Sequence, residues 1–396
     1  MEEQLKKQVN TWRTVAIIAI ALLVIVTAVF MSNGKGAGVQ QNTEPTAAAT
    51  AETTAEPVET EPTATAATVA ADVIDADAIM KSWTEGAASK QALVSYMEKI
   101  TDENSKDFIP VEKRIAVFDL DGTLFCETDP VYFDYCLLLH RVEEDPDYTP
   151  SEREKEVAAM IHEQIDTGKA PEGIEVAHGQ AIASSFAGFT VQEFLDYVKV
   201  FRELPARSYE GMTIGDGFYQ PMVELVDYLQ KNLFTVFIVS GTDRLIVRGI
   251  VDGKLDIPDY QIIGSDETIV ASGQEGEDGL EYVYTDEDQL VLGGDFIVKN
   301  LKMNKVSVIM QEIGEKPVLS FGNSTGDSSM CKYVTSNNPY PSMAFMLCCD
   351  DTVRENGSES KAEKMVQICE ENGWVPVSMK NDWTTIYGEG VTRKAN

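Results

Sequence analysis

Four short apolar runs constrain the fold most, because each is typical of a strand buried on both faces. They are 114–120 (RIAVFDL), 234–239 (FTVFIV), 318–321 (VLSF) and 343–349 (MAFMLCC). Segments with helical patterns lie between them, for example 221–232 and 306–313. Strands that alternate with helices indicate a parallel sheet with helices on both faces. We therefore expect an α/β fold of the Rossmann-like type.

Two segments depart from this alternation. Residues 132–206 are mostly polar with a helical pattern, and we expect a helical insertion with boundaries near 132 and 215. Residues 280–293 (LEYVYTDEDQLVLG) have the pattern of a β-hairpin. The expected fold is thus a parallel sheet that carries one helical insertion and one hairpin.

The N-terminal segment contains a nearly continuous apolar run at 15–31. As a helix, these 17 residues would span about 25 Å, close to the ~30 Å hydrocarbon core of a bilayer. The nearby basic residues all precede the run: Lys6, Lys7 and Arg13. By the positive-inside rule, 1–13 is cytoplasmic and everything after the run is outside. We expect an uncleaved transmembrane signal anchor at 14–32; a cleaved signal peptide is the alternative.

A compositionally biased segment follows at 33–75, rich in Ala, Thr, Glu and Pro. Such a composition buries too little apolar surface to offset chain entropy, so we expect a disordered linker. Globular patterning begins near residue 76 and continues to residue 396. The sequence therefore predicts one domain, 76–396, held away from a membrane by a spacer.

Charge and cysteine content exclude several classes of protein. The 32 Lys and Arg residues against 65 Asp and Glu give a formal net charge of −33, whereas nucleic-acid binding needs a basic face. The six cysteines include no CxxC pair and no Cys/His zinc spacing, so a structural zinc site is not expected. An acidic exterior is compatible with small substrates, cationic groups or metal ions.

The segment 118–125 (FDLDGTLF) carries the first chemical signal. Asp119 and Asp121 sit at the carboxyl end of an expected buried strand, where ligands bind in open α/β sheets. Two carboxylates this close repel each other unless a divalent cation lies between them. Gly122 permits a tight turn directly afterwards. Taken alone, a strand end with solvated aspartates and a glycine turn explains the segment equally well.

Further polar residues follow the next expected strands. Ser240, Gly241 and Thr242 come directly after 234–239, and a hydroxyl or a free N–H there can bind a phosphate oxygen. Lys305 precedes an apolar helix, and GNSTGD at 322–327 supplies Asn323 and Asp327 after the third strand. Parallel strand ends meet at one edge of a sheet, so we expect these groups to lie together.

With these four motifs in order, the chain resembles the haloacid dehalogenase superfamily, in its phosphoserine-phosphatase-like branch with a C1-type cap. The resemblance implies that Asp119 is the nucleophile and Asp121 the general acid and base, with Ser240 and Lys305 binding the phosphoryl group. It also implies Gly241 and Glu127 as substrate-binding residues. Its implied Mg²⁺ ligands come from the first and fourth motifs: Asp119, Asp121 through its carbonyl, Asn323 and Asp327.

The chain departs from that branch at two positions. Asn323 stands where an aspartate is usual, and an amide oxygen can ligate Mg²⁺ but brings no charge. Glu127 is offset by one residue from the acid that contacts a substrate amine. Asp121 speaks against a dehalogenase, because that branch lacks this acid. His140, His162 and His178 lie in the expected cap without partner spacing, so each is expected to be a packing or surface residue.

The sequence therefore predicts a Mg²⁺-dependent phosphomonoesterase that acts through an aspartyl-phosphate on a small phosphate ester, with phosphoserine-like and phosphocholine-like esters as the candidate substrates. We expect it to be membrane-anchored with an extracytoplasmic domain and no nucleic-acid partner. One alternative is a phosphomutase or phosphotransferase of the same superfamily. Another is a non-catalytic surface binding module.

Overall fold

The computed structural model describes residues 74–395. The predicted cytoplasmic segment 1–13, the predicted signal anchor 14–32 and nearly all of the predicted linker 33–75 lie outside the described residues, so these three remain predictions. No helix in the described part of the chain is both long and apolar enough to cross a membrane.

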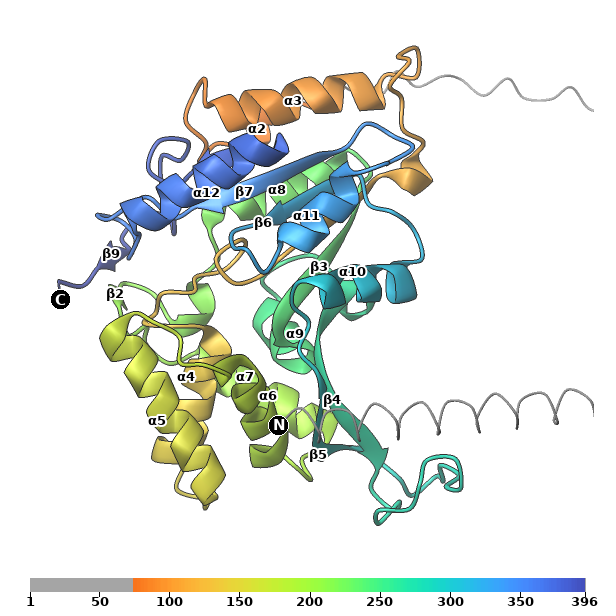
Figure 1. The fold of residues 1–396 in the computed structure, drawn as a ribbon, viewed down its shortest axis with the longest axis vertical. Helices are drawn as coiled ribbons and strands as arrows, with labels where there is room; N and C mark the ends of the chain where they lie inside the picture. Colours follow the sequence, from red (N-terminus) through yellow and green to blue (C-terminus); the bar gives the residue numbers. More distant parts are fainter. Residues whose placement is uncertain (1–73, 396) are drawn as a thin grey trace, which may run out of the picture. The chain divides into compact units, whose positions relative to one another are not determined.

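A seven-stranded sheet forms the centre of the fold, in the order β5-β4-β3-β1-β6-β7-β8 (Figure 1). Its strands are β1 (Ile115–Phe118), β3 (Thr235–Asp243), β4 (Ile262–Ala271), β5 (Leu290–Val298), β6 (Leu319–Gly322), β7 (Met343–Cys348) and β8 (Val375–Ser378). All neighbouring strands are parallel except β4 and β5. The expectation of an α/β fold with a mostly parallel sheet is confirmed. A two-stranded antiparallel ladder joins β2 (Tyr209–Glu210) to β9 (Thr392–Arg393).

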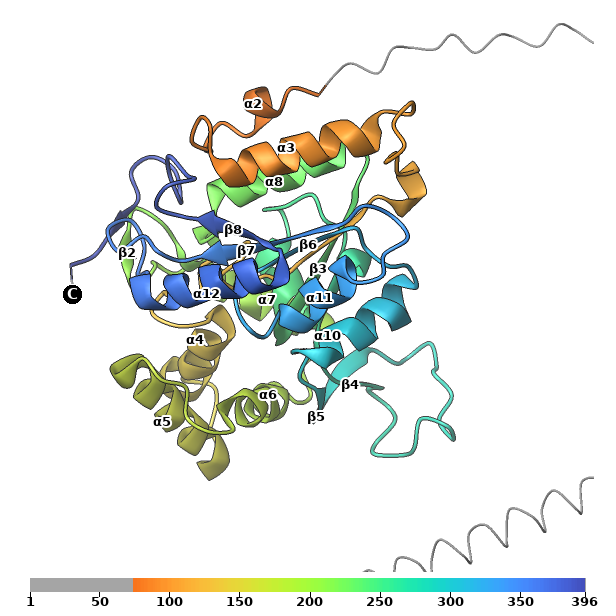
Figure 2. The ribbon, with the colours of Figure 1, turned by 45° about the horizontal axis from the view of Figure 1, so that its top comes forward.

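Helices cover both faces of the sheet, as Figures 1 and 2 show. The flanking helices are α2 (Ala76–Ile79), α3 (Ala88–Thr101), α8 (Gln220–Lys231), α9 (Arg244–Val251), α10 (Met303–Val308), α11 (Ser328–Thr335) and α12 (Glu359–Asn372). Short 3-10 turns lie at Val111–Lys113, Ile214–Asp216 and Asp259–Gln261, and π-helical turns at His140–Glu144 and Ile309–Ile313.

Strand β1 shows why the predicted runs are apolar throughout. Ala116 and Phe118 pack into the cluster shared with α3 and α8, whereas Val117 packs into the cluster shared with α10 and α11. Successive side chains of a strand point to opposite faces, so a strand covered on both sides needs apolar residues at every position. β1 lies between β3 and β6, which brings the carboxyl ends of these three strands together.

Four of the helices between β1 and β3 are grouped to one side of the sheet in Figure 1 and are called the cap helices here. They are α4 (Phe133–Leu139), α5 (Glu152–Thr167), α6 (Ile174–Ser185) and α7 (Val191–Arg202). Capping boxes fix two of their starts, formed by Ser151 with Glu154 at α5 and by Thr190 with Glu193 at α7. Each satisfies backbone N–H groups that a helix start leaves without partners.

The hairpin prediction is wrong in its first strand. An antiparallel pair exists, but it joins β4 to β5, and the residues between them, including 280–289, form a loop. Asp288 explains the loop, because its carboxylate accepts hydrogen bonds from the backbone N–H groups of Gly273 and Thr285, both at 2.8 Å. A turn stabilised by a side chain replaces the ladder that alternation indicated.

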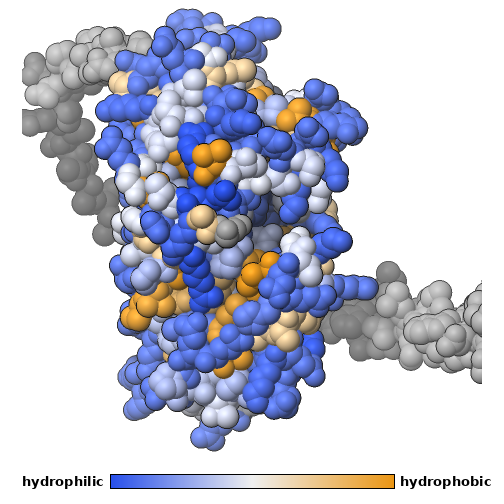
Figure 3. Space-filling model, turned by 90° about the vertical axis from the view of Figure 1, so that its left-hand side faces the viewer, coloured by the Kyte–Doolittle hydropathy of each residue, from blue (hydrophilic) through white to orange (hydrophobic). Residues whose placement is uncertain are grey.

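The exterior agrees with the acidic composition. Figure 3 shows one face that is mostly hydrophilic, with small scattered hydrophobic patches. The most exposed large apolar side chains include Leu280 and Val283 in the β4–β5 loop.

Candidate active site

Asp119 continues the line of β1, and the chain turns away directly after it. The Asp119 N–H still donates to the carbonyl of Phe321, at 2.9 Å, as the next bond of the β1–β6 ladder. The N–H groups of Thr123, Leu124 and Phe125 then all donate to the carbonyl of Leu120. This tight turn leaves the Asp119 and Asp121 side chains 7% and 8% exposed at the edge of the sheet.

Lys305 joins the first and fourth motifs through two buried ion pairs. Its Nζ lies 2.5 Å from Oδ1 of Asp119 and 2.7 Å from Oδ1 of Asp327, and the lysine is fully buried. Burial alone would lower the pKa of Lys305, but the two carboxylates outweigh it and hold the pKa above its usual value. Burial and the charge of Asp327 raise the pKa of Asp119 to about 7, against the opposing effect of Lys305.

The loop after β6 holds Asp327 in place. Its Oδ2 accepts hydrogen bonds from the N–H groups of Asn323 and Ser324, each at 3.1 Å. Its Oδ1 is thereby turned toward Lys305. GNSTGD is thus a turn that presents one carboxylate to the edge of the sheet.

The end of β3 contributes a hydroxyl to Asp121. Thr242 Oγ1 donates to Asp121 Oδ2 at 2.7 Å, while Asp121 Oδ1 is buried and has no partner among residues 74–395. Burial, followed by the charges of Asp134 and Asp119, raises the pKa of Asp121 well above its usual value. Ser240 is fully buried, and its Oγ accepts from the Thr242 N–H at 3.0 Å.

Gly122 lies where two motifs come closest. Its φ is +75°, and a Cβ there would lie 1.8 Å from Asn323 Nδ2 and 2.7 Å from Glu127 Cδ. A glycine is required by both the backbone conformation and this close approach. Burial raises the pKa of the Glu127 carboxyl to about 8, and a hydrogen bond with Asn323 partly opposes the rise.

A pocket of about 290 Å³ opens over these residues. Six of the eight residues singled out from the sequence border it: Asp119, Asp121, Glu127, Gly241, Asn323 and Asp327. The other two, Ser240 and Lys305, are fully buried and do not border it. Sequence reasoning missed Asp134 of α4 and Glu175 of α6, which border the pocket from the cap helices. No local pattern marks them, because they reach the pocket only through the packing of the insertion.

The oxygen donor atoms around the pocket are of the kind that binds a hard divalent cation. The pocket gathers carboxylate oxygens of Asp119 and Asp327 and the side-chain amide of Asn323. Oxygen donors of this type are those that Mg²⁺ prefers. Within residues 74–395, no three Asp, Glu, His or Cys side chains already converge as a metal-binding group. Lys305 instead bridges Asp119 and Asp327.

No model of a known protein family matches the chain, and no curated protein does. Among solved structures, the chain is similar to a conserved protein of unknown function from Anaerococcus prevotii DSM 20548, with 14% identity over 75% of this chain and 92% of that one and a TM-score of 0.46. It is also similar to cytosolic 5'-nucleotidase IIIB bound to cytidine, with 11% identity, 75% and 88% coverage and a TM-score of 0.46. A substrate-bound phosphoserine phosphatase gives 17% identity, 60% and 86% coverage and a TM-score of 0.32. Since these identities and scores are low, function has to be inferred from the residues of the site.

Proposed function

We propose that this protein is a Mg²⁺-dependent phosphomonoesterase of the haloacid dehalogenase type, which hydrolyses a small phosphate ester through an aspartyl-phosphate. The observation that carries the proposal is the buried Asp119–Lys305–Asp327 ion-pair network. It lies beside a second carboxyl, Asp121, at the edge of one pocket. A nucleophile held by a cation and flanked by an acid is the arrangement that covalent phosphoryl transfer requires.

In the first step, Asp119 attacks the phosphorus atom of the ester. Its Oδ1 is bound by Lys305, which leaves Oδ2 to form the new O–P bond. The bond between phosphorus and the alcohol oxygen breaks, and Asp121 donates a proton to that oxygen, so the alcohol leaves neutral. The hydrogen bond from Thr242 to Oδ2 of Asp121 fixes the carboxyl, and Oδ1, which has no partner within residues 74–395, is the oxygen that would carry the proton.

In the second step, water hydrolyses the aspartyl-phosphate. Asp121, now ionised, takes a proton from the water as its oxygen attacks phosphorus. The bond between phosphorus and Asp119 breaks, inorganic phosphate forms, and both aspartates return to their starting states. One difficult displacement is thereby divided into two easier ones.

The phosphoryl oxygens need positive charge and N–H donors. Lys305 supplies charge, the backbone at Gly241 and the hydroxyl of Thr242 border the pocket, and Ser240 supports that loop from beneath. Mg²⁺, when bound by Asp119, the Asp121 carbonyl, Asn323 and Asp327, would neutralise charge that develops on the phosphoryl group. Because Asn323 is uncharged, Asp327 carries more of the affinity in this proposal.

Two alternatives differ in what they release. A phosphomutase or phosphotransferase would pass the phosphoryl group to a second alcohol and not to water. A non-catalytic binding module would release nothing. The intact set of Asp119, Asp121, Lys305 and Asp327 favours an enzyme over the binding module, and an extracytoplasmic location disfavours a mutase that serves cytoplasmic sugar phosphates.

The test is phosphate release by the full-length protein from p-nitrophenyl phosphate and a panel of phosphate esters, with Mg²⁺ and with excess EDTA. We expect turnover that needs the metal and falls at least about a thousandfold in Asp119→Asn, because the variant lacks the nucleophile. Asp166→Asn, an exposed aspartate in α5, makes the same chemical change away from the pocket and should retain activity. Acid-quenched enzyme should carry phosphate on Asp119 by mass spectrometry. No turnover on any ester would refute the proposal.

The location is a separate part of the proposal, supported by the apolar run, its flanking charges and the linker composition. Protease treatment of intact cells should release the domain by cutting at 33–75. Protection of that segment would place the domain on the cytoplasmic side.

A further inference from the structure

The pocket has a second wall that the proposed phosphoryl chemistry does not use. Tyr132, Asp134 and Tyr135 come from the start of α4, and Glu175 comes from α6. Glu127 joins them from the loop after β1. Asp134 borders the same pocket as Asp121, the residue proposed to protonate the leaving alcohol. This wall is therefore placed to contact the alcohol part of the ester.

Asp134 is a buried carboxylate without a charged partner. It is 2% exposed, and its Oδ1 has no hydrogen-bond partner in the described part of the chain. The nearest basic group is His178, whose Nδ1 lies 3.7 Å from Oδ2. Burial lowers the pKa of His178 to about 4, so the imidazole is neutral at neutral pH and does not balance the carboxylate. A buried, unpaired carboxylate beside an open pocket is costly unless a ligand supplies the missing charge.

The other charged groups around the pocket do not form an ion pair with Asp134 in the described part of the chain. Glu127 and Glu175 add two further carboxyl groups to the same wall, and neither brings positive charge. Lys299 and Lys302 border the pocket from the segment after β5, and neither forms an ion pair with these acids within residues 74–395. The Lys302 N–H donates to the carbonyl of Gly326 in the fourth motif, whereas Lys299 lines a small cavity together with Asp134 and His178.

Two aromatic rings stand beside the acids. Tyr132 and Tyr135 have ring centroids 5.3 Å apart and planes at 71°, so they form an edge-to-face corner on the pocket wall. The faces of aromatic rings attract cations, and an acid beside such a ring adds to the attraction. Together with Asp134, the corner has the composition of a site for an organic cation.

We infer that the alcohol part of the ester carries a positively charged nitrogen, an alkylammonium group. Asp134 and Glu175 bind this group electrostatically, and the rings of Tyr132 and Tyr135 enclose it. The inference rests on the proposed phosphatase function, since it assigns the alcohol of that reaction. It adds Asp134 and Glu175 as specificity-determining residues.

The structure also offers a competing route for the alcohol. A second cavity of about 430 Å³ shares Glu127, Tyr132 and Asn323 with the pocket and continues toward α12. Its wall contains Lys361 and Lys364, which would suit an anionic alcohol. Esters with cationic, neutral and anionic alcohols therefore distinguish the two routes.

The experiment compares kcat/KM of the full-length protein with Mg²⁺ for phosphocholine and 3,3-dimethylbutyl phosphate. These esters have the same shape, but a neutral carbon replaces the charged nitrogen in the second. We expect phosphocholine or phosphoethanolamine to exceed the neutral ester at least about tenfold, from charge pairing and cation–aromatic attraction. The two cationic esters distinguish a quaternary from a primary ammonium, and phosphoglycolate tests the α12 route.

Asp134→Asn and Glu175→Gln should each reduce the preference for the cationic ester at least about threefold. The readout is the ratio of kcat/KM for the cationic ester to kcat/KM for its neutral isostere, so an effect of a variant that is common to both esters cancels. Glu172→Gln removes the same charge from an exposed cap residue that does not border the pocket, and should leave the preference intact. Glu175 is exposed, so its variant carries the test even if Asp134→Asn does not fold.

A ratio near one, a faster anionic ester, or a preference that both variants retain would overturn the inference while p-nitrophenyl phosphate is still hydrolysed. Loss of all hydrolysis, in contrast, contradicts the proposed function. In that case, thermal stabilisation by choline over 3,3-dimethylbutanol still measures the cation site. Equal shifts for the two alcohols would refute the site itself.

Discussion

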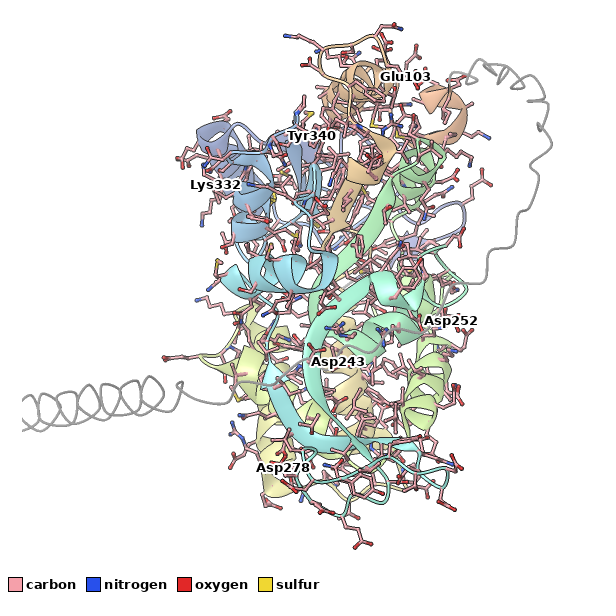
Figure 4. The ribbon with its side chains drawn as sticks, turned by 90° about the vertical axis from the view of Figure 1, so that its right-hand side faces the viewer. Glu103, Asp243, Asp252, Asp278, Lys332 and Tyr340 are labelled. Carbon is pink, nitrogen blue, oxygen red and sulfur yellow. The ribbon has the colours of Figure 1, made fainter. Side chains whose placement is uncertain are left out.

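Glu267 in β4 is a buried acid for which the fold provides no partner. It is 7% exposed, and neither carboxyl oxygen has a hydrogen bond within residues 74–395. Its charged neighbours are Asp243, labelled in Figure 4 at the end of β3, and Asp266, which is paired with Arg244 at 2.8 Å. Burial, followed by the charges of Asp243 and Asp266, raises the pKa of Glu267 to about 9 from 4.5.

This shift makes the stability of the protein depend on pH. Because the folded-state pKa is raised, the folded chain keeps a proton that the unfolded chain loses, so stability falls as pH rises from 4.5 toward 9. At pH 7, ionisation favours the unfolded chain by up to about 3 kcal/mol, from about 1.4 kcal/mol per pH unit above 4.5. At pH 5 the same effect is below about 1 kcal/mol.

Glu267→Gln keeps the shape of the side chain and removes its ionisation. We expect the free energy of unfolding to rise by about 1–3 kcal/mol at pH 7 and by less than about 1 kcal/mol at pH 5. Urea denaturation of both proteins at several pH values, followed by tryptophan fluorescence, measures this difference. Glu281→Gln, an exposed acid in the β4–β5 loop, is the matched control and should show no such trend. A stability gain that is equal at pH 5 and pH 8, or a loss at pH 7, would refute the reasoning.

Two further predictions concern the candidate active site. Lys305→Met should abolish turnover and, without metal, lower the free energy of unfolding by about 3–5 kcal/mol, because Asp119 and Asp327 are left buried without their shared cation. Urea denaturation measures this loss, and an unchanged stability would contradict the ion-pair network. Gly122→Ala should lower kcat/KM at least about tenfold and stability by about 1–3 kcal/mol, because its Cβ would meet Asn323 at 1.8 Å in a strained backbone conformation. Gly168→Ala is the control: the φ of Gly168 is also positive, at +66°, but an added Cβ would have no atom within 4 Å, so this variant imposes backbone strain without a steric clash. Equal effects of the two variants on kcat/KM would contradict the role given to Gly122.

The strands that sequence analysis found and missed differ in one physical property. β1, β3, β6 and β7 are covered on both faces, so nearly every position is apolar and the runs are visible in the sequence. β4 was missed because Asp266 and Glu267 interrupt its pattern, and the interruption is the buried acid cluster itself. The hairpin was misplaced because the carboxylate of Asp288, and not alternation, determines the loop.

The same contrast holds for the candidate active site. Asp119, Asp121, Asn323 and Asp327 directly follow apolar strands, so their meeting at one edge follows from sheet order alone. Asp134 lies in α4, which is buried along its whole length, and Glu175 lies in the first turn of α6; only the packing of these helices brings the two acids to the pocket. The residues of the proposed reaction therefore lie at strand ends, whereas the residues proposed to select the alcohol belong to the insertion. If that division is correct, substitutions of Asp134 in α4 and Glu175 in α6 should change the ratio of kcat/KM between cationic and neutral esters more than they change the hydrolysis of p-nitrophenyl phosphate.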